Sequence, residues 1–389
     1  MPDRSRSPGP VLVADAGSSS LHLTAFADDG TVLASRDSAS APGSDVADQL
    51  RELLKDAPTP VAVGHRIVHG GPQLRAHTLV DGSVRDRLRF AAELAPLHVP
   101  PALAVLDAAR DLLPDLPHAA CFDTVFHAGL SAAAREYAVP ARWRREYGIQ
   151  RYGFHGLSYA WALARSSGLL TARPEDLQIV IAHLGGGCSA CAVRNGHSVD
   201  TTMGLTPLEG LVMSRRSGSL DPGALIWLQT RHGFTPRELD DALNHHSGLL
   251  ALSGTSGDTR DLVRDRAAGD ENAALALDVF THRCRCGIAA MAASLDRLDA
   301  LVFTGEIGED QPEIREAVCA GLTTLGLAGD LLVPAGGSEA PAELLSGPGA
   351  ETPVVLVPTG EARQVALETR RLLSDGWLSP GRTPGGNSP

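Results

Sequence analysis

Apolar and polar positions follow one shared pattern in two segments, VLVADAGSSSLHLTAF at residues 11–26 and IVIAHLGGGCSACAVR at residues 179–194. In each segment a β-branched apolar run enters a cluster of small residues and leaves through positions that alternate with a period of two. A turn sequence follows each copy, Asp28-Asp29-Gly30 in the first and Asn195-Gly196 in the second. The pattern therefore predicts two similar β-hairpins, and their repetition predicts two related domains that face each other.

The turns of the two predicted hairpins consist of small residues, Gly17 to Ser20 in the first and Gly185 to Ser189 in the second. Such turns expose successive backbone N–H groups, an arrangement that receives phosphate oxygens. Each turn by itself is more typical of an ordinary tight hairpin, but the duplication favours the phosphate-binding interpretation.

Helical periodicity alternates with short apolar runs over the rest of the chain, which is typical of an α/β protein. The predicted helices span residues 101–113, 222–232, 272–295, 311–325 and 361–373. For the fourth of these, Asp310 as N-cap and Glu313 three residues later predict a capping box. Gly305 and Gly308 precede it, so this helix start can face a phosphate or a ribose.

Composition narrows the class of protein. A chain of 389 residues predicts about two domains, and a net charge of −12 with a pI near 5.6 argues against a nucleic-acid surface. No apolar run approaches the roughly 18–20 residues of a membrane span, and the six cysteines are expected to be reduced. We therefore expect a cytoplasmic protein without nucleic-acid or membrane partners. Residues rich in Pro and Gly predict disorder over the first nine or so residues and over 379–389, and a surface loop over 334–353.

Lysine and arginine together number 34, and Lys55 is the only lysine. Its surroundings fit neither a Walker loop, nor the strand lysine of protein kinases, nor a pyridoxal Schiff base. The sequence also lacks helix-spaced zinc ligands and the Gly-x-Ser-x-Gly elbow of acyl hydrolases. Cys188, Cys191, Cys284 and Cys286 lie within a predicted strand or helix, so we expect small buried thiols there and not metal ligands.

Arg66 follows an apolar run in GHRIVHGG, residues 64–71. An arginine at the carboxyl edge of a sheet can present its guanidinium to an oxyanion, although a buried structural ion pair is equally consistent with this segment alone. Further segments combine arginines, histidines and acids with glycines, at residues 95–103, 121–127, 151–161, 200–223, 253–262, 302–310 and 357–362. Paired phosphate turns, arginines and no available catalytic lysine together indicate phosphoryl transfer without a Walker loop.

These segments resemble the acetate kinase family, which shares a superfamily with sugar kinases, heat-shock ATPases and actin. The resemblance runs in order from Val11 to about Leu372, and DTTMGLTPLEG with RSGSLDPG, within residues 200–223, is its most specific part. It implies an α/β fold of two duplicated actin-like (ribonuclease H-like) lobes with a cleft between them. The implied N-terminal lobe is 1–127 closed by the C-terminal helix 362–378, the C-terminal lobe with the nucleotide site is 128–361, and 379–389 is a disordered tail.

The resemblance assigns roles to individual positions. Arg66 and Arg216 match two catalytic arginines that bind the carboxylate and stabilise the phosphoryl group in flight. His155 matches a histidine that hydrogen-bonds this group, and Asp123 an acid that orients groups around it. The resemblance also implies a pocket for the methyl group, formed by Val68, Leu97, Phe154 and Pro207. His98 and His183 match further active-site histidines. Because a carboxylate substrate is already ionised near neutral pH, no general base is needed.

The resemblance also implies a nucleotide and a metal ion. ATP is the implied co-substrate, and Mg²⁺, with Mn²⁺ as an alternative, is implied beside Asp15 and Glu361. The implied nucleotide-binding residues are Ser18, Ser20, His22, His183, Gly185, Gly186, Gly187, Asp258, Thr259, Arg260, Gly305, Glu306, Ile307, Gly308 and Asp310.

Several polar positions depart from the usual residues of the family. Asp15, Gly186, Val99 and Asp310 stand for Asn, His22 for Lys, Tyr159 for His and Glu306 for Gly. Related kinases and actin carry Asp at the position of Asp15, where it holds Mg²⁺ through water. Glu306 adds bulk and negative charge beside the expected nucleotide, whereas Asp310 remains a good N-cap.

The sequence therefore predicts an acetate kinase that interconverts acetate and ATP with acetyl phosphate and ADP by direct in-line transfer. The resemblance also implies a homodimer. The alternatives left open are a propionate or butyrate kinase, a kinase whose donor is pyrophosphate or GTP, and a nucleotide-binding regulatory protein that has lost turnover.

Overall fold

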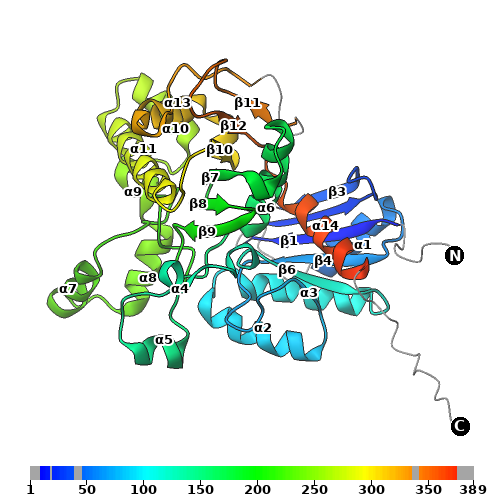
Figure 1. Cartoon of the computed structure of the whole chain (residues 1–389). Helices are drawn as coiled ribbons and strands as arrows, with labels where there is room; N and C mark the ends of the chain where they lie inside the picture. The colour runs from blue at the N-terminus through cyan, green and yellow to red at the C-terminus, as the bar shows by residue number, and fades with distance from the viewer. Residues whose placement is uncertain (1–8, 18–19, 39–45, 335–340, 375–389) are drawn as a thin grey trace, which may run out of the picture. The chain divides into compact units, whose positions relative to one another are not determined.

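The computed structural model describes residues 9–17, 20–38, 46–334 and 341–374. The chain divides into two compact units, one running up to Phe122 and resuming at Ala362, the other comprising Asp123–Glu361. Within the described residues each unit contains one six-stranded sheet with helices packed on it (Figure 1). The assignment of folding domains, with its predicted boundary after residue 127, stays a prediction.

The sheet of the first unit has the order β3-β2-β1-β4-β6-β5. Its strands are β1 (Val11–Ala16), β2 (Leu21–Phe26), β3 (Val32–Ser38), β4 (Ala62–Ile67), β5 (Thr78–Leu79) and β6 (His118–Phe122). β1, β4 and β6 are parallel, whereas β2, β3 and β5 run antiparallel to their neighbours. The parallel strands are nearly wholly buried, as expected where helices cover both faces of a sheet.

The helices of the first unit are α1 (Val46–Asp56), α2 (Gly82–Leu94), α3 (Val99–Leu112) and α14 (Glu361–Ser374). α14 returns from the far end of the sequence and packs on β4 beside the blue strands of Figure 1. A side chain at Gly64 would overlap Thr369 and Val365, so the glycine allows this close approach. Arg370 on the same helix pairs with Asp28 after β2.

The sheet of the second unit has the order β11-β12-β10-β7-β8-β9. Its strands are β7 (Gln178–Leu184), β8 (Cys188–Arg194), β9 (His197–Thr201), β10 (Ala300–Thr304), β11 (Glu343–Leu344) and β12 (Val354–Leu356). β7, β10 and β12 are parallel, and β8, β9 and β11 run antiparallel to their neighbours.

The two sheets have the same topology. Reading the second as β9-β8-β7-β10-β12-β11 matches each strand of the first in order and direction. Even the register shift recurs, between Ala25 and Phe26 in the first sheet and between Ala192 and Val193 in the second. The predicted α/β fold of two duplicated lobes is therefore confirmed. The two predicted hairpins are confirmed as well, as β1–β2 and β7–β8.

The helices of the second unit are α4 (Ala132–Arg135), α5 (Ala141–Tyr147), α6 (Gly156–Leu169), α7 (Pro222–His232), α8 (Pro236–His245), α9 (Gly248–Ser253), α10 (Thr259–Ala267), α11 (Glu271–Ala292), α12 (Glu306–Asp310) and α13 (Pro312–Ala320). Its core joins Tyr159 and Leu163 of α6 to Ile179 and Ile181 of β7 and to Val302 of β10. The long helix α11 contacts β7 and β8 as well. This packing anchors the hairpin β7–β8 and the start of α6 in one core.

Most predicted helices match observed ones, and 222–232 matches α7 residue for residue. The predicted capping box at Asp310 is wrong. Asp310 is the last residue of the short helix α12, and α13 has Gln311 as N-cap without a side-chain hydrogen bond. The predicted helix 311–325 ends at Ala320, and Thr323–Leu325 is a separate 3-10 turn. Gly321 follows Ala320, and a glycine there weakens continuation of the helix.

Two smaller expectations also need correction. Cys286 lies on the exposed side of α11, whereas Cys188, Cys191 and Cys284 are buried as expected. The predicted loop 334–353 contains β11, which pairs with β12 through Glu343 and Leu344. The predicted disorder at 379–389 and over the first eight residues falls outside the described residues. None of the described helices is long and apolar enough to cross a membrane.

Candidate functional site

The first unit carries a row of ionisable residues across its sheet. Asp15 of β1 lies in register with Arg66 of β4 on one side and with His22 of β2 on the other. Nη1 of Arg66 donates to Oδ2 of Asp15 over 2.9 Å, and both side chains are largely buried. His22 in turn pairs with Asp37 of β3 at 2.8 Å in exposed positions. The ion pair that the sequence left open for Arg66 is therefore present, with Asp15 as its partner.

The remaining predicted residues of the first unit lie near this row or before α3. The turn after β1 is closed by a hydrogen bond from Gly17 N to Ser20 O of 2.9 Å, and Ser18 lies outside the described residues. Val68 follows β4, and Leu97 and His98 directly precede α3. Val68, Leu97 and His98 are half-buried, so part of each remains accessible to a small ligand.

In the second unit, two histidines from different elements stack on each other. His155 is the N-cap of α6 and adopts the left-handed conformation, with φ 58°. Its ring lies 4.1 Å from that of His183 on β7, and the two planes are inclined by 24°. Nδ1 of His183 contacts Oγ of Ser158 at 2.9 Å, and Nδ1 of His155 contacts Oγ of Ser189 at 2.8 Å. Both rings are thereby held by serine hydroxyls.

The second small-residue turn brings Arg216 to these histidines. A Cβ on Gly187 would lie 2.7 Å from Nη2 of Arg216 and 3.2 Å from Nε2 of His155. The glycine therefore leaves room for both groups directly over the turn. Arg216 also donates to the carbonyl of Pro207 over 2.6 Å, which places Pro207 beside the same guanidinium. Burial lowers the pKa of Arg216 from its ordinary value, because the charged form loses hydration.

Asp123 and Phe154 lie next to the start of α6. The carbonyl of Asp123 accepts from Gly156 N over 2.9 Å, and that of Phe154 accepts from Nε2 of His127 over 3.0 Å. A side chain on Gly156 would overlap the Asp123 carbonyl, so a glycine is needed after His155. Asp123, Phe154, His155, His183, Pro207, Arg216 and the glycine turn are thus neighbours in one unit.

A separate cavity of about 520 Å³ opens beside this turn. It is lined by Gly186, Ser214, Arg215, Ser256, Gly257, Asp258, Thr259, Arg260, Glu306, Ile307, Asp310 and Gln311. The two segments predicted to bind the nucleotide, 258–260 and 305–310, therefore meet across one hollow. The turn itself borders it, because a Cβ on Gly185 would lie 3.7 Å from N of Glu306 and 3.6 Å from Nε2 of His183.

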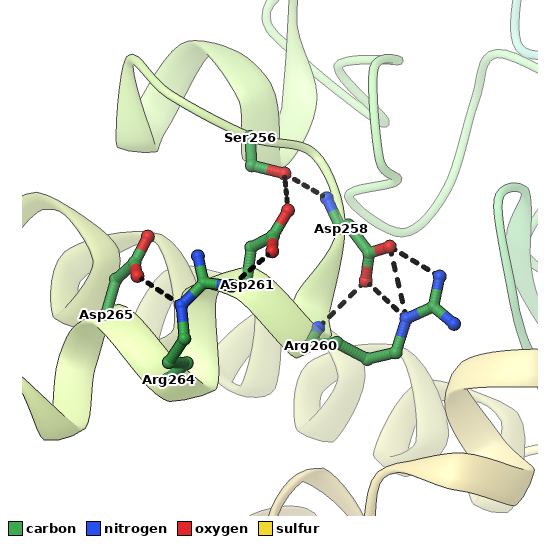
Figure 2. A network of polar contacts seen from close by, with 6 residues as sticks. All are labelled: Ser256, Asp258, Arg260, Asp261, Arg264 and Asp265. Atoms are coloured by element: carbon green, nitrogen blue, oxygen red, sulfur yellow. Dashed lines mark hydrogen bonds and ion pairs between the residues drawn. The ribbon is translucent and has the colours of Figure 1, made fainter.

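One wall of the cavity is a preorganised polar network (Figure 2). Asp258 caps α10, accepting from Arg260 N at 2.9 Å, and its carboxylate also receives the guanidinium of Arg260 at 2.6 Å. Ser256 accepts from Asp258 N at 3.0 Å and donates to Asp261 at 2.8 Å. The hydrogen bonds that Arg260 donates to Asp258 raise the pKa of Arg260, and the charges of Asp310 and Glu306 raise it further. Arg260 thus offsets acids on both sides of the cavity.

The two predicted metal-binding carboxylates, Asp15 and Glu361, lie in different units. Among the described residues no three His, Cys, Asp or Glu side chains form a closed metal site. Mg²⁺ does not need one, because it keeps several waters and binds one or two carboxylates together with substrate phosphates. Asp15 borders the first turn, and Glu361 lies near Glu309. Burial raises the pKa of Glu309, and the negative charges of Asp310 and Glu361 raise it further, so this region favours a cation.

Several residues of the site were not singled out from the sequence. Ser158 and Ser189 hold the two histidines, and Ser214, Arg215, Ser256, Gly257 and Gln311 line the cavity. Arg215 and Ser214 adjoin Arg216 in SRRSG, and Ser189 ends the second turn, so proximity to predicted residues was an available signal.

Comparison with known proteins identifies the family. The model of the acetokinase family matches residues 32–367. An acetate kinase of Synechococcus sp. is 48% identical over 284 residues, 73% of this chain and 70% of that protein. A propionate kinase of Enterobacter sp. is 43% identical over 310 residues, 80% of this chain and 77% of that protein. The crystal structure of Porphyromonas gingivalis acetate kinase superposes with a TM-score of 0.83 at 30% identity, covering 94% of this chain and 100% of that chain. The chain therefore belongs to the acetokinase family.

Proposed function

We propose that this protein is an acetate kinase, a phosphotransferase that moves a phosphoryl group reversibly between ATP and the carboxylate of acetate. The observation that carries the proposal is the approach of Arg216 and His155 over the glycine turn at Gly187. A cation and an imidazole held over exposed backbone N–H groups suit the charge of a transferring phosphoryl group. Membership of the family implies ATP and a divalent metal ion as well.

Transfer is direct and in line, because no residue has to act as covalent carrier or base. The acetate oxygen is already ionised and attacks the γ-phosphorus while the bond to ADP breaks. Arg66 and Arg216 supply positive charge to the carboxylate and to the phosphoryl oxygens. His155 donates a hydrogen bond to the phosphoryl group, and Asp123 orients the groups around it.

The nucleotide occupies the cavity lined by Asp258, Thr259 and Arg260 on one side and by α12 on the other. The turn Gly185–Gly187 at its edge receives the phosphates, with His183 beside it. Mg²⁺ is the proposed metal ion, and Asp15 and Glu361 are the residues that would hold it. When bound, it would neutralise charge on the phosphates.

Trapping the product tests this function. Protein, acetate, ATP and Mg²⁺ are incubated with hydroxylamine, which converts acetyl phosphate to a coloured hydroxamate. We expect colour that depends on each substrate and is abolished by Arg216→Ala. Folded wild-type protein that gives no hydroxamate above background would refute the enzyme function and favour the regulatory alternative.

Propionate is the second candidate acyl substrate, because the propionate kinase of Enterobacter sp. is 43% identical to this chain. One added methylene changes binding in an apolar pocket by only about 1–3 kcal/mol. Comparing kcat/KM for acetate, propionate and butyrate decides the order. A ratio of propionate to acetate above one would change the assigned substrate and leave the reaction type in place.

The phosphoryl donor needs its own test. Glu306 and Asp310 place two acids at the cavity, and Gly186 offers no side chain to the ligand. ATP, GTP and pyrophosphate are compared at equal concentration with acetate saturating. Faster turnover with GTP or pyrophosphate would reject ATP as the donor.

We also propose that two copies of the chain associate through α7. None of its residues is buried, and Ile226 and Trp227 remain 61% and 55% exposed. Such a patch on a stable protein is typical of an interface. Light scattering on Trp227→Arg should give a monomer where the wild type gives a dimer; a monomeric wild type would contradict the proposal.

The cytoplasmic location stays a prediction.

A further inference from the structure

The hydroxyl of Ser189 lies between two rings in the core of the second unit. On one side Nδ1 of His155 is 2.8 Å away, and on the other the hydroxyl of Tyr159 forms a very short hydrogen bond. Ser189 on β8 and Tyr159 on α6 are both fully buried. Burial raises the pKa of Tyr159 well above its ordinary value, so the phenol keeps its proton. Three side chains therefore share two hydrogen bonds, and both hydroxyls lie away from water.

Counting protons leaves one arrangement in which every buried donor is paired. Within the described residues, neither the Tyr159 phenol nor the Ser189 hydroxyl has a side-chain partner outside this chain of contacts. If Tyr159 donates to Ser189 and Ser189 donates to Nδ1 of His155, both O–H groups are satisfied. If Nδ1 of His155 were protonated and donated to Ser189, one of the two O–H groups would have no acceptor. A buried donor without an acceptor is disfavoured.

We propose that Ser189, whose hydroxyl accepts from Tyr159, is a positioning residue that fixes the tautomer of His155, leaving its Nδ1 bare and its Nε2 protonated. Nε2 is the edge that faces Gly187 and Arg216, since a Cβ on Gly187 would lie 3.2 Å from it. A neutral imidazole with its proton there can donate to a phosphoryl oxygen. The opposite tautomer would present a lone pair to that oxygen and repel it. This inference rests on the proposed kinase function for its catalytic consequence, but the tautomer itself does not.

The wild-type protein gives the direct test. Protein labelled with ¹⁵N-histidine is studied by long-range ¹H–¹⁵N correlation at neutral pH, and the His155 signals are assigned by their loss in His155→Asn. We expect Nδ1 with the shift of an unprotonated nitrogen and Nε2 with that of an N–H. The reverse pattern would overturn the inference whatever the activity.

Ser189→Ala separates positioning from mere packing. Without the Ser189 hydroxyl, Nδ1 of His155 loses its donor, so the His155 spectrum should show the other tautomer as well. We expect kcat to fall about tenfold or more, with the KM values for acetate and ATP nearly unchanged. In Tyr159→Phe the Ser189 hydroxyl still has Nδ1 as its acceptor, so the tautomer should persist there.

Ser166→Ala on α6 is the matched control, because its buried hydroxyl donates to the carbonyl of Ala162 instead. It should leave both the His155 spectrum and kcat close to wild type. A loss of kcat in Ser189→Ala with the tautomer unchanged would show a structural role only and overturn the proposal. An inactive wild type with the expected tautomer would refute the proposed function and leave this inference standing.

Discussion

The two duplicated hairpins place different chemistry at equivalent positions of one backbone. In the first sheet Asp15 lies in register with His22 and Arg66, and Arg66 forms an ion pair with Asp15. The equivalent residue of the second sheet is His183, which lies in register with Ser189 and Thr304. An acid, an arginine and an imidazole thus occupy positions of one sheet where an imidazole and two hydroxyls occupy the other.

The difference decides which arginine carries net positive charge to a ligand. Arg66 is compensated by the Asp15 carboxylate at 2.9 Å. Arg216 donates to the Pro207 carbonyl, and among the described residues no carboxylate pairs with it. A buried cation without a counter-ion is unfavourable until an anion arrives. The first unit therefore carries an arginine that is balanced by an acid, and the second carries an arginine that an anionic ligand would balance.

Removing the uncompensated arginine should have the largest effect. Arg216→Ala takes away charge that stabilises the transferring phosphoryl group, and we expect kcat to fall about 10²- to 10³-fold or more. Steady-state kinetics measures kcat, and thermal unfolding checks that the variant is folded. Arg237→Ala on the exposed surface of α8 should keep near-normal rates. A normal kcat in folded Arg216→Ala would end the distinction between the two arginines.

The glycine under Arg216 gives the next largest effect. In Gly187→Ala the new methyl group overlaps Arg216 and crowds His155, so both must shift. A displacement near 1 Å can reduce catalysis roughly 10²-fold, and we expect a loss of that order in kcat. Gly168→Ala on α6 is the control, since a methyl group there meets only open space. If both variants had equal activity, the approach over Gly187 would not matter for turnover.

Acid should destabilise the first unit before the second. Burial lowers the pKa of His65, His77 and His118 in the first unit, that of His77 to about 4, and it lowers the pKa of His127 in the second unit to about 4 as well. The unfolded chain binds more protons below its histidine pKa near 6.5, so the stabilisation is complete above that pH and is lost as the pH falls towards 4.

Each such histidine contributes up to about 1.4 kcal/mol per pH unit in this window. Hydrogen exchange at pH 7 and pH 5, corrected for the intrinsic rates, compares the two units directly. We expect peptides of β4 and β6 to lose protection before those of β7 and β10. Earlier loss in the second unit would contradict the comparison.

The smallest effect should come from neutralising Asp15. Asp15→Asn removes the counter-ion of Arg66 while keeping a hydrogen-bond acceptor, so Arg66 becomes more like Arg216. A partly exposed ion pair is worth up to about 1 kcal/mol, and we expect KM for acetate to fall a few-fold. An unchanged KM with a higher Mg²⁺ requirement would assign Asp15 to the metal ion alone.

Sequence patterns predicted the framework better than the details of the site. The hairpins at 11–26 and 179–194 were predictable, because apolar positions that alternate with a period of two around a glycine cluster fit few structures other than a β-hairpin. The meeting of 258–260 with 305–310 was implied by resemblance. The split of the helix at Gln311 was not predictable, because α12 depends on Gly305 at φ 87° packed against Leu184. The stack of His155 on His183 likewise depends on tertiary packing.

The left-handed backbone of His155 links activity to a loss of stability. A side chain with φ near 58° is strained, and glycine would adopt this conformation more readily. Selection for thermal stability alone would therefore favour His155→Gly, which discards the imidazole above Gly187. A library screened by melting temperature should enrich inactive protein at this position, whereas one screened by turnover should keep the strained histidine.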